Sequence, residues 1–161
     1  GGLPTNRTRV VTSEFLKSAM EKAEQLGRPK RLRVQIFDTG APISFSAAEN
    51  YLALALGNLL SNAVKHSPEG GLVSITCKPT GKDELLFTVA DQGEGIPQVL
   101  LEKIFDPFFR VDSARNRVAG GVGIGLSLAR AMAALHGGAI KAESSPGKGS
   151  QFHLTISQAF S

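Results

Sequence analysis

A glycine-rich stretch near the end of the chain, GGVGIGLSLAR at residues 120–130, has the composition of an anion site. Glycine turns that lead into a helix bind anions because backbone N–H groups and the helix dipole converge there, and no Cβ blocks the ligand. Spacing excludes two common phosphate motifs. Leu126 stands where the dinucleotide fingerprint GxGxxG needs its third glycine, and the chain has no GxxxxGK[ST] sequence. The stretch therefore predicts a phosphate site of another kind.

A row of polar side chains follows the apolar stripe of the helix predicted over residues 46–66. Asn58 and Asn62 are four residues apart. Lys65 and His66 follow three and four residues later, so all four side chains project from one side of the helix. An asparagine amide oxygen suits Mg²⁺, and a lysine meets phosphate as a point charge. Taken alone, the row fits an exposed amphipathic helix equally well.

A third cluster, ADQGEGIP at residues 90–97, follows the end of a predicted strand. Asp91 is expected to point from the end of the sheet, and Gly93 and Gly95 remove side chains where a ligand could lie. A carboxylate only accepts hydrogen bonds, so it favours the exocyclic amine of adenine over the carbonyl of guanine. A tight Asp-Gly turn without a ligand is the alternative.

The segment IFDPFFR at residues 104–110 places aromatic rings just after that loop and before a basic stretch. Buried rings can anchor a mobile lid while Arg110 stays free to meet phosphate. Arg115 and Arg117 lie where a closing lid could bring guanidinium groups to phosphate. A small satellite core and solvated loop charges are the alternatives.

In this order, the four clusters resemble the catalytic, ATP-binding domain of sensor histidine kinases, within the GHKL group. NLLSNAVKHS resembles the N box, DQGEGIP the first glycine box, IFDPFFR the F box and GGVGIGL the second glycine box. The resemblance implies ATP and Mg²⁺ as ligands, with Asn62 holding the metal, Asn58 as its companion and Asp91 reading adenine. It implies catalytic roles for Asn58, Asn62, Lys65 and Arg110, and nucleotide contacts for Lys65, His66, Gly93, Gly95, Ile96, Arg115, Arg117, Gly121, Val122, Gly123, Ile124, Gly125 and Leu126.

Three positions depart from patterns found in the group. His66 replaces the usual tyrosine but can still donate a hydrogen bond, whereas Val122 replaces a threonine or serine and removes a hydroxyl donor. ATPases and serine kinases of the group have a glutamate base where this chain has Asn58. An amide cannot take a proton from water or serine at neutral pH, whereas a neutral imidazole already has a nucleophilic lone pair. Asn58 therefore favours a histidine acceptor and argues against a vigorous ATPase.

Periodicity predicts elements that agree with the family's Bergerat fold, a two-layer α/β sandwich. The mixed sheet has about five main strands, with helices on one face and a long ATP lid over about residues 105–123. Alternating apolar residues predict the strands, and apolar residues at three- and four-residue intervals predict the helices. The expected helices are 12–27, 46–66 and 125–135, and the expected strands are 31–37, 72–78, 84–90, 139–143 and 151–156.

The composition indicates a single domain spanning residues 1–161, with 42% hydrophobic and 20% charged residues. No apolar run approaches the length of a membrane span, so no membrane contact is expected of this chain. The net charge is +4, yet the chain has no Trp and one Tyr, which argues against single-stranded nucleic acid. Cys77 alternates with apolar residues and is expected to be a core thiol, in keeping with a cytoplasmic location.

The resemblance implies transfer of the ATP γ-phosphoryl group to a histidine on a separate dimerisation domain, with a response regulator downstream. None of the three histidines fits that acceptor: His66 belongs to the N box, His136 is expected at a helix end facing the dipole, and His153 on a strand surface. Residues 1–10 are expected to lead toward the acceptor domain, and this domain alone is expected to be monomeric. An ATP-gated conformational module and a nucleotide-binding pseudo-kinase remain the alternatives.

Overall fold

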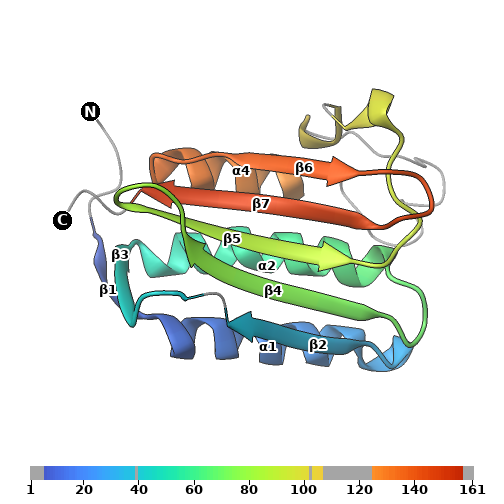
Figure 1. Cartoon of the computed structure of the whole chain (residues 1–161), viewed down its shortest axis with the longest axis horizontal. Coiled ribbons are helices and arrows are strands. Elements are labelled where there is room, and N and C mark those ends of the chain that lie inside the picture. The colour runs from blue at the N-terminus through green and yellow to red at the C-terminus, as the bar shows by residue number, and fades with distance from the viewer. Residues whose placement is uncertain (1–5, 39, 102, 107–124, 158–161) are drawn as a thin grey trace.

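The chain forms one five-stranded mixed sheet with its α-helices packed on one face, as shown by the computed structural model in Figure 1. The structure describes residues 6–38, 40–101, 103–106 and 125–157. The strands are β2 (Arg33–Asp38), β4 (Leu72–Pro79), β5 (Glu84–Asp91), β6 (Ile140–Ser144) and β7 (Ser150–Ser157). Their order is β2-β4-β5-β7-β6, with β2 parallel to β4 and the other neighbours antiparallel. The predicted two-layer α/β sandwich is confirmed.

Among the described residues, three α-helices form the second layer: α1 (Thr12–Gly27), α2 (Glu49–His66) and α4 (Gly125–Leu135). Helix α2 packs against both α1 and α4 and also contacts β5. Short 3₁₀ turns are η1 (Arg28–Lys30), η2 (Gln98–Leu100) and η3 (Lys103–Phe105). In the described part of the chain, no helix is both long and apolar enough to cross a membrane.

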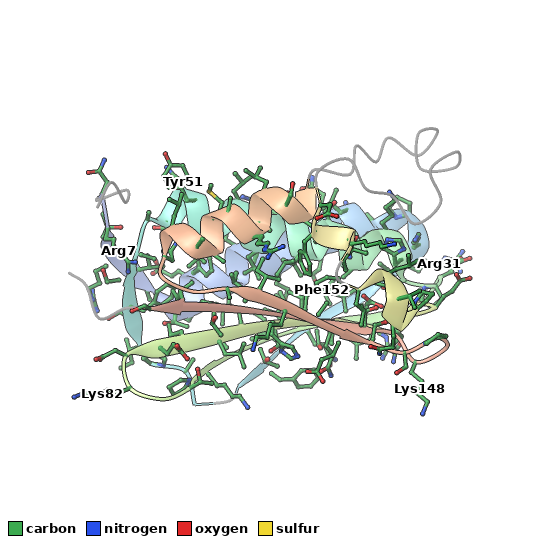
Figure 2. All side chains as sticks on the ribbon, turned by 90° about the horizontal axis from the view of Figure 1, so that it is seen from above. Arg7, Arg31, Tyr51, Lys82, Lys148 and Phe152 are labelled. Carbon is green, nitrogen blue, oxygen red and sulfur yellow. The ribbon has the colours of Figure 1, made fainter. Side chains whose placement is uncertain are left out.

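The core lies between the sheet and the helices because each strand buries alternate residues. On β5 these are Leu85, Phe87 and Val89, all with no exposed surface. Leu52, Leu56, Leu59 and Ala63 of α2 face them at helical spacing and are equally buried. Figure 2 shows Phe152 of β7 between the two layers. Cys77 is a buried core thiol, as predicted, and burial raises its pKa to about 12.

A second, two-stranded sheet was not predicted. Strands β1 (Thr8–Val11) and β3 (Ser44–Ala47) pair antiparallel, so the segment 1–10 includes the start of a strand. The predicted helix start at Ser46 is wrong, because Phe45 and Ala47 are buried in strand alternation and α2 begins at Glu49. The predicted strand start at Arg31 is also wrong. Arg31 has a φ of 57°, which is incompatible with a strand, and β2 begins two residues later.

The structure places both His136 and His153 where the sequence predicts them, and it adds contacts that the sequence did not reveal. His136 directly follows the last residue of α4, as predicted, and it is only 1% exposed and links two helices. The N–H of Ala48, before α2, donates to its Nε2 at 3.1 Å, and its Nδ1 lies 2.9 Å from the Met132 carbonyl oxygen of α4. His153 points outward from β7, as predicted, and its ring bridges Thr88 and Glu143.

Candidate nucleotide site

The end of α2 presents the predicted polar row. Asn58, Asn62 and His66 stand at four-residue intervals on one side of the helix, and Lys65 lies beside them. The two asparagines are half-buried, whereas Lys65 and His66 are exposed. The buried Leu59 and Ala63 hold this part of the helix against the core. The structure therefore places an amide pair and a cation on one anchored surface.

Asp91 ends β5 and points into the layer that contains the helices. It is 8% exposed, and its Oδ1 accepts a hydrogen bond of 2.8 Å from the N–H of Gly93. Burial raises the pKa of this carboxyl group, while the Gly93 N–H, His66 and the Ser150 backbone N–H act in the opposite direction. The carboxylate is thus oriented by the backbone beside the end of α2.

The loop after Asp91 packs directly against the end of α2. A Cβ on Gly93 would overlap the carbonyl oxygen of His66, so only glycine allows this approach. The pKa of His66 is lowered, first by partial desolvation and then by the charge of Lys65, while Asp91 and Glu94 oppose that shift. The structure therefore brings Asp91, Gly93 and His66 together, although they come from separate sequence clusters.

The turn between β6 and β7 supports the same loop, a role that the sequence did not predict. The Ser144 hydroxyl oxygen accepts from the Ile96 N–H at 2.6 Å and lies 2.9 Å from the Ser150 hydroxyl. Gly95, with a φ of 83°, packs against the Ser145 carbonyl, where a Cβ would overlap it. The two glycines of SSPGKGS were the signal available in the sequence, since both Gly147 and Gly149 adopt positive φ.

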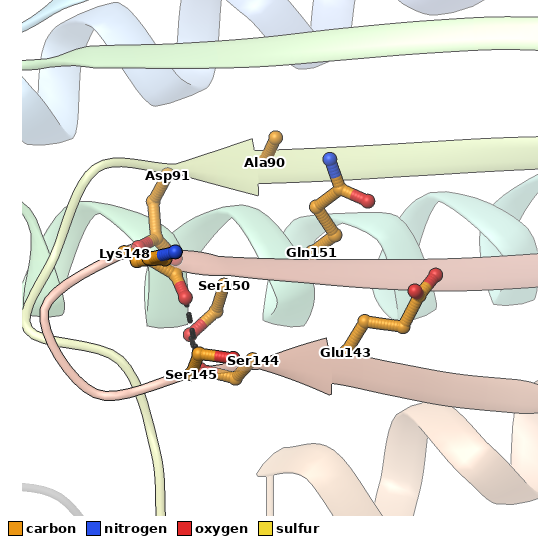
Figure 3. A pocket seen from close by; sticks show the side chains of 9 residues that line it. Ala90, Asp91, Glu143, Ser144, Ser145, Lys148, Ser150 and Gln151 are labelled. Carbon is orange, nitrogen blue, oxygen red and sulfur yellow. Dashed lines mark hydrogen bonds between the residues drawn. The ribbon is translucent and has the colours of Figure 1, made fainter.

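A shallow hollow of about 210 Å³ opens beside Asp91 at the ends of β5, β6 and β7 (Figure 3). Gly149 forms part of its wall and packs so closely on the Asp91 backbone that a Cβ would overlap the Asp91 carbonyl oxygen. Lys148 and Glu143 supply charges of both signs to its lining. The β6–β7 turn and the Asp91 loop therefore form one continuous support.

Phe105 is buried, as the sequence predicts for a ring of the F box, whereas the alternative of a small satellite core is wrong for the first two residues of this segment. Ile104 and Phe105 belong to the main core rather than to a satellite cluster, and Phe105 packs edge-on against Phe152 with ring centroids 6.3 Å apart. Gly125 begins α4, and Leu126 packs partly buried against the core. The other predicted lid and phosphate residues lie outside the described part of the chain: Arg110, Arg115, Arg117, Gly121, Val122, Gly123 and Ile124.

A family model supplies the decisive comparison. The model described as "Histidine kinase-, DNA gyrase B-, and HSP90-like ATPase" matches residues 47–159. The chain belongs to this ATPase family. The match contains every site residue that the structure describes, from Asn58 to Leu126. The predicted resemblance to the ATP-binding domains of sensor histidine kinases is confirmed, and membership supports ATP binding by this domain.

Individual relatives of this ATPase domain are sensor kinases. The sensor histidine kinase WalK of Bacillus subtilis is 45% identical over 109 residues, which cover 67% of this chain and 18% of that protein. The adaptive-response sensory kinase SasA of Crocosphaera subtropica is 32% identical over 155 residues, which cover 96% of this chain and 40% of that protein. The chain therefore spans less than half the length of these two curated relatives.

Solved structures match the ATPase domain over almost its whole length. The nucleotide-free catalytic domain of histidine kinase ThkA superimposes with a TM-score of 0.82 at 26% identity, covering 96% of this chain and 97% of that chain. Full-length ShkA, solved in complex with AMPPNP, gives a TM-score of 0.85 at 24% identity and covers all of this chain and 33% of that one. The ShkA likeness shows the fold alone.

Proposed function

We propose that this domain binds Mg·ATP and donates the γ-phosphoryl group to a histidine on a separate dimerisation domain. The single observation that supports it most is the buried Asp91 carboxylate, held by the Gly93 N–H against the end of α2. An acceptor-only group at a rigid position suits the exocyclic amine of adenine and disfavours guanine.

The donor set at the end of α2 fits a magnesium-bound polyphosphate. The half-buried amide of Asn62 offers an oxygen ligand of the kind Mg²⁺ accepts alongside phosphate oxygens and water. We assign Asn58 as its companion and Lys65 as a charge that offsets phosphate, with His66 as a hydrogen-bond donor. When bound, the metal neutralises charge on the phosphates.

We extend the assignment to the residues around Asp91 and to the lid. Gly93, Gly95 and Ile96 form the loop beside adenine. Gly125 and Leu126 begin the helix that follows the lid. Arg110, Arg115, Arg117 and the stretch 121–124 are proposed phosphate contacts on the strength of their sequence positions alone.

Asn58 bears on which reaction the domain performs. An amide at this position cannot serve as the general base that activates water or a serine hydroxyl, whereas a neutral imidazole acceptor needs no such base. We therefore assign the domain to the cytoplasmic part of a two-component sensor kinase, with its acceptor histidine on another domain and a response regulator as the next recipient. Its own task is to position the nucleotide.

Nucleotide titrations test the binding half of this proposal. Calorimetric titration of the domain with a nonhydrolysable ATP analogue and its GTP counterpart, each with Mg²⁺ and with EDTA, is expected to give tight binding only for the adenine analogue with Mg²⁺. Equal affinity for both bases would contradict the role of Asp91.

A second assay tests transfer. Labelled ATP, this domain and a supplied histidine-bearing dimerisation domain are expected to give acid-labile phosphate on the acceptor, and this domain alone is expected to stay unlabelled. Binding without labelling of any supplied acceptor would favour a pseudo-kinase. Rapid hydrolysis with no acceptor present would favour an ATP-gated conformational module.

A further inference from the structure

Lys30 holds the end of the helix that carries the proposed magnesium and phosphate residues. It is the last residue of η1 and is half-buried beneath α2. Its Nζ donates to the carbonyl oxygens of Val64 at 3.0 Å, Lys65 at 2.7 Å and Ser67 at 2.9 Å. An ammonium group has three N–H donors, so these three bonds use all of them.

The Lys30 ammonium group provides hydrogen bonds and a positive charge at a helix C-terminus. The last carbonyl groups of an α-helix lack intrahelical partners and carry the negative end of the helix dipole, so a cation there is stabilising. One further carbonyl, that of Ala63, accepts a 2.7 Å bond from the Ser67 hydroxyl. The Val64 carbonyl also accepts from the Ser67 N–H at 3.3 Å, and Lys30 adds a charge and three hydrogen bonds to this end of α2.

The remaining carbonyl of this run belongs to His66, and it faces the other half of the site. Gly93 packs against it so closely that a Cβ would overlap the oxygen. The end of α2 therefore contacts Lys30 through three carbonyl groups and the Asp91 loop through the carbonyl of His66. The Lys30 carbonyl oxygen also accepts a 2.8 Å bond from the Gly70 N–H, which ties down the connection that leads from α2 to β4.

We propose that Lys30 is a positioning residue of the nucleotide site, which sets the last turn of α2 in place relative to the Asp91 loop. The inference rests on the proposed function. Because its three donors are already used, Lys30 acts through the helix end and does not itself contact phosphate. Lys30 thereby keeps Asn62 and Lys65 aligned with the Asp91 carboxylate, which is proposed to recognise adenine.

Binding measurements on three variants test this role. Lys30→Met keeps the aliphatic stem but removes the charge and the N–H donors. It is expected to lower the affinity for the Mg²⁺-bound, nonhydrolysable ATP analogue about tenfold. Lys30→Arg keeps a cation with several N–H donors and is expected to recover most of that loss. Lys22→Met, which makes the same change at an exposed position of α1, is the matched control and is expected to bind within about twofold of the wild type.

The titration of the His66 imidazole, followed by NMR, gives a second readout that general destabilisation would not produce. The Lys30 charge is one of the causes that lower the pKa of His66, so Lys30→Met is expected to raise that pKa in the folded protein. Lys30→Arg and Lys22→Met are expected to leave it near the wild-type value. The other charged groups that act on His66 are Lys65, Asp91 and Glu94, and all variants keep them.

The outcomes separate this inference from the proposed function. If the wild type binds the analogue and a folded Lys30→Met binds it equally well, the inference is overturned, even if the melting temperature falls. If Lys30→Met does not fold, Lys30→Gln, which retains two N–H donors without charge, takes its place, and wild-type affinity in that variant overturns the inference equally. If the wild type itself does not bind the analogue, the proposed function fails and the inference that rests on it fails too, whereas a wild type that binds beside an unimpaired Lys30→Met overturns the inference alone.

Discussion

The N–H of Gly93 lies 2.8 Å from Oδ1 of Asp91, two residues earlier, and this bond fixes a carboxylate that is almost fully buried. A short local bond of this kind restricts the side chain to one orientation. Because Gly93 also packs against the His66 carbonyl, the orientation of Asp91 is tied to the end of α2. Asp91, which is proposed to recognise adenine, and the end of α2, which is proposed to bind phosphate, are therefore held in a fixed relative position.

Replacing Asp91 by asparagine tests the base-reading role. The amide oxygen of Asp91→Asn can still accept from Gly93, but its NH₂ group presents donors where adenine needs an acceptor. Calorimetry is expected to show at least about a tenfold loss of affinity for the ATP analogue. The melting temperature is expected to change little, because the amide keeps the Gly93 bond and the cost of burying a charge is removed. Asp83→Asn, in the exposed β4–β5 turn at a φ of 62°, is the control. Equal affinity in the two variants would refute the role.

A methyl group at Gly93 tests the close approach of the loop and α2. Gly93→Ala is expected to lower the free energy of unfolding by about 1–3 kcal/mol, because its Cβ overlaps the His66 carbonyl oxygen. Gly57→Ala within α2 meets nothing within 4 Å and is expected to raise that free energy by about 0.5–1 kcal/mol, since alanine favours the helix. Urea unfolding measures both. An unchanged free energy of unfolding in Gly93→Ala would mean that the Asp91 loop and the end of α2 move apart easily.

The metal-binding role of Asn62 has a distinct signature. Asn62→Ala removes the amide oxygen, so the gain in analogue affinity on adding Mg²⁺ is expected to disappear, while the affinity measured in EDTA stays the same. The neighbouring exposed Ser61→Ala is the control and is expected to keep the full magnesium effect. Titrations with and without Mg²⁺ measure this difference. A normal magnesium effect in Asn62→Ala would place the metal ligand elsewhere.

The buried His136 predicts a pH dependence of stability. Its Nδ1 bonds the Met132 carbonyl and its Nε2 accepts from Ala48, so the neutral ring fits and a second proton would displace the Ala48 bond. Burial, together with the charge of Arg7, lowers its pKa. The unfolded chain therefore takes up a proton as pH falls through the ordinary value of 6.5 while the native chain resists, and stability falls with pH.

Melting temperatures measured from about pH 7.5 to about pH 5.5 check this sign. His136→Gln can accept from Ala48 and donate to Met132 without titrating, so its melting temperature is expected to fall less than that of the wild type. The lowered pKa of His66 is present in both proteins and contributes alike. Equal falls in the two proteins would exclude His136 as a source of the dependence.

Local patterns were enough to predict most of the architecture. The bounds predicted for α1 and α4 agree with the structure, because each helix has an apolar period and a glycine stop. The four-residue strands β1 and β3 were too short for such a signal, and their pairing joins residues 33–39 positions apart. The bond from Ala48 to His136 spans 88 residues and leaves no local trace.

The candidate site likewise contains residues that the sequence predicted and residues that only the fold revealed. Residue types in the N box and the Asp91 cluster predicted the chemistry, and the structure brings Asp91, Gly93 and His66 together. The supporting role of Ser144 and of the β6–β7 turn depends on contacts 46–48 residues apart, so it required the fold. Lys30 lies outside every recognised cluster for the same reason, since its partners are 34–37 residues away.

The strand order leaves β2 and β6 at the two margins of the large sheet. Arg33 on β2, and Lys141 and Glu143 on β6, are exposed there. A strand of another molecule that paired with either margin would have to remove water from these charged side chains. Charged side chains on edge strands protect against edge-to-edge aggregation for this reason. Growth by strand addition is therefore disfavoured where these charges lie.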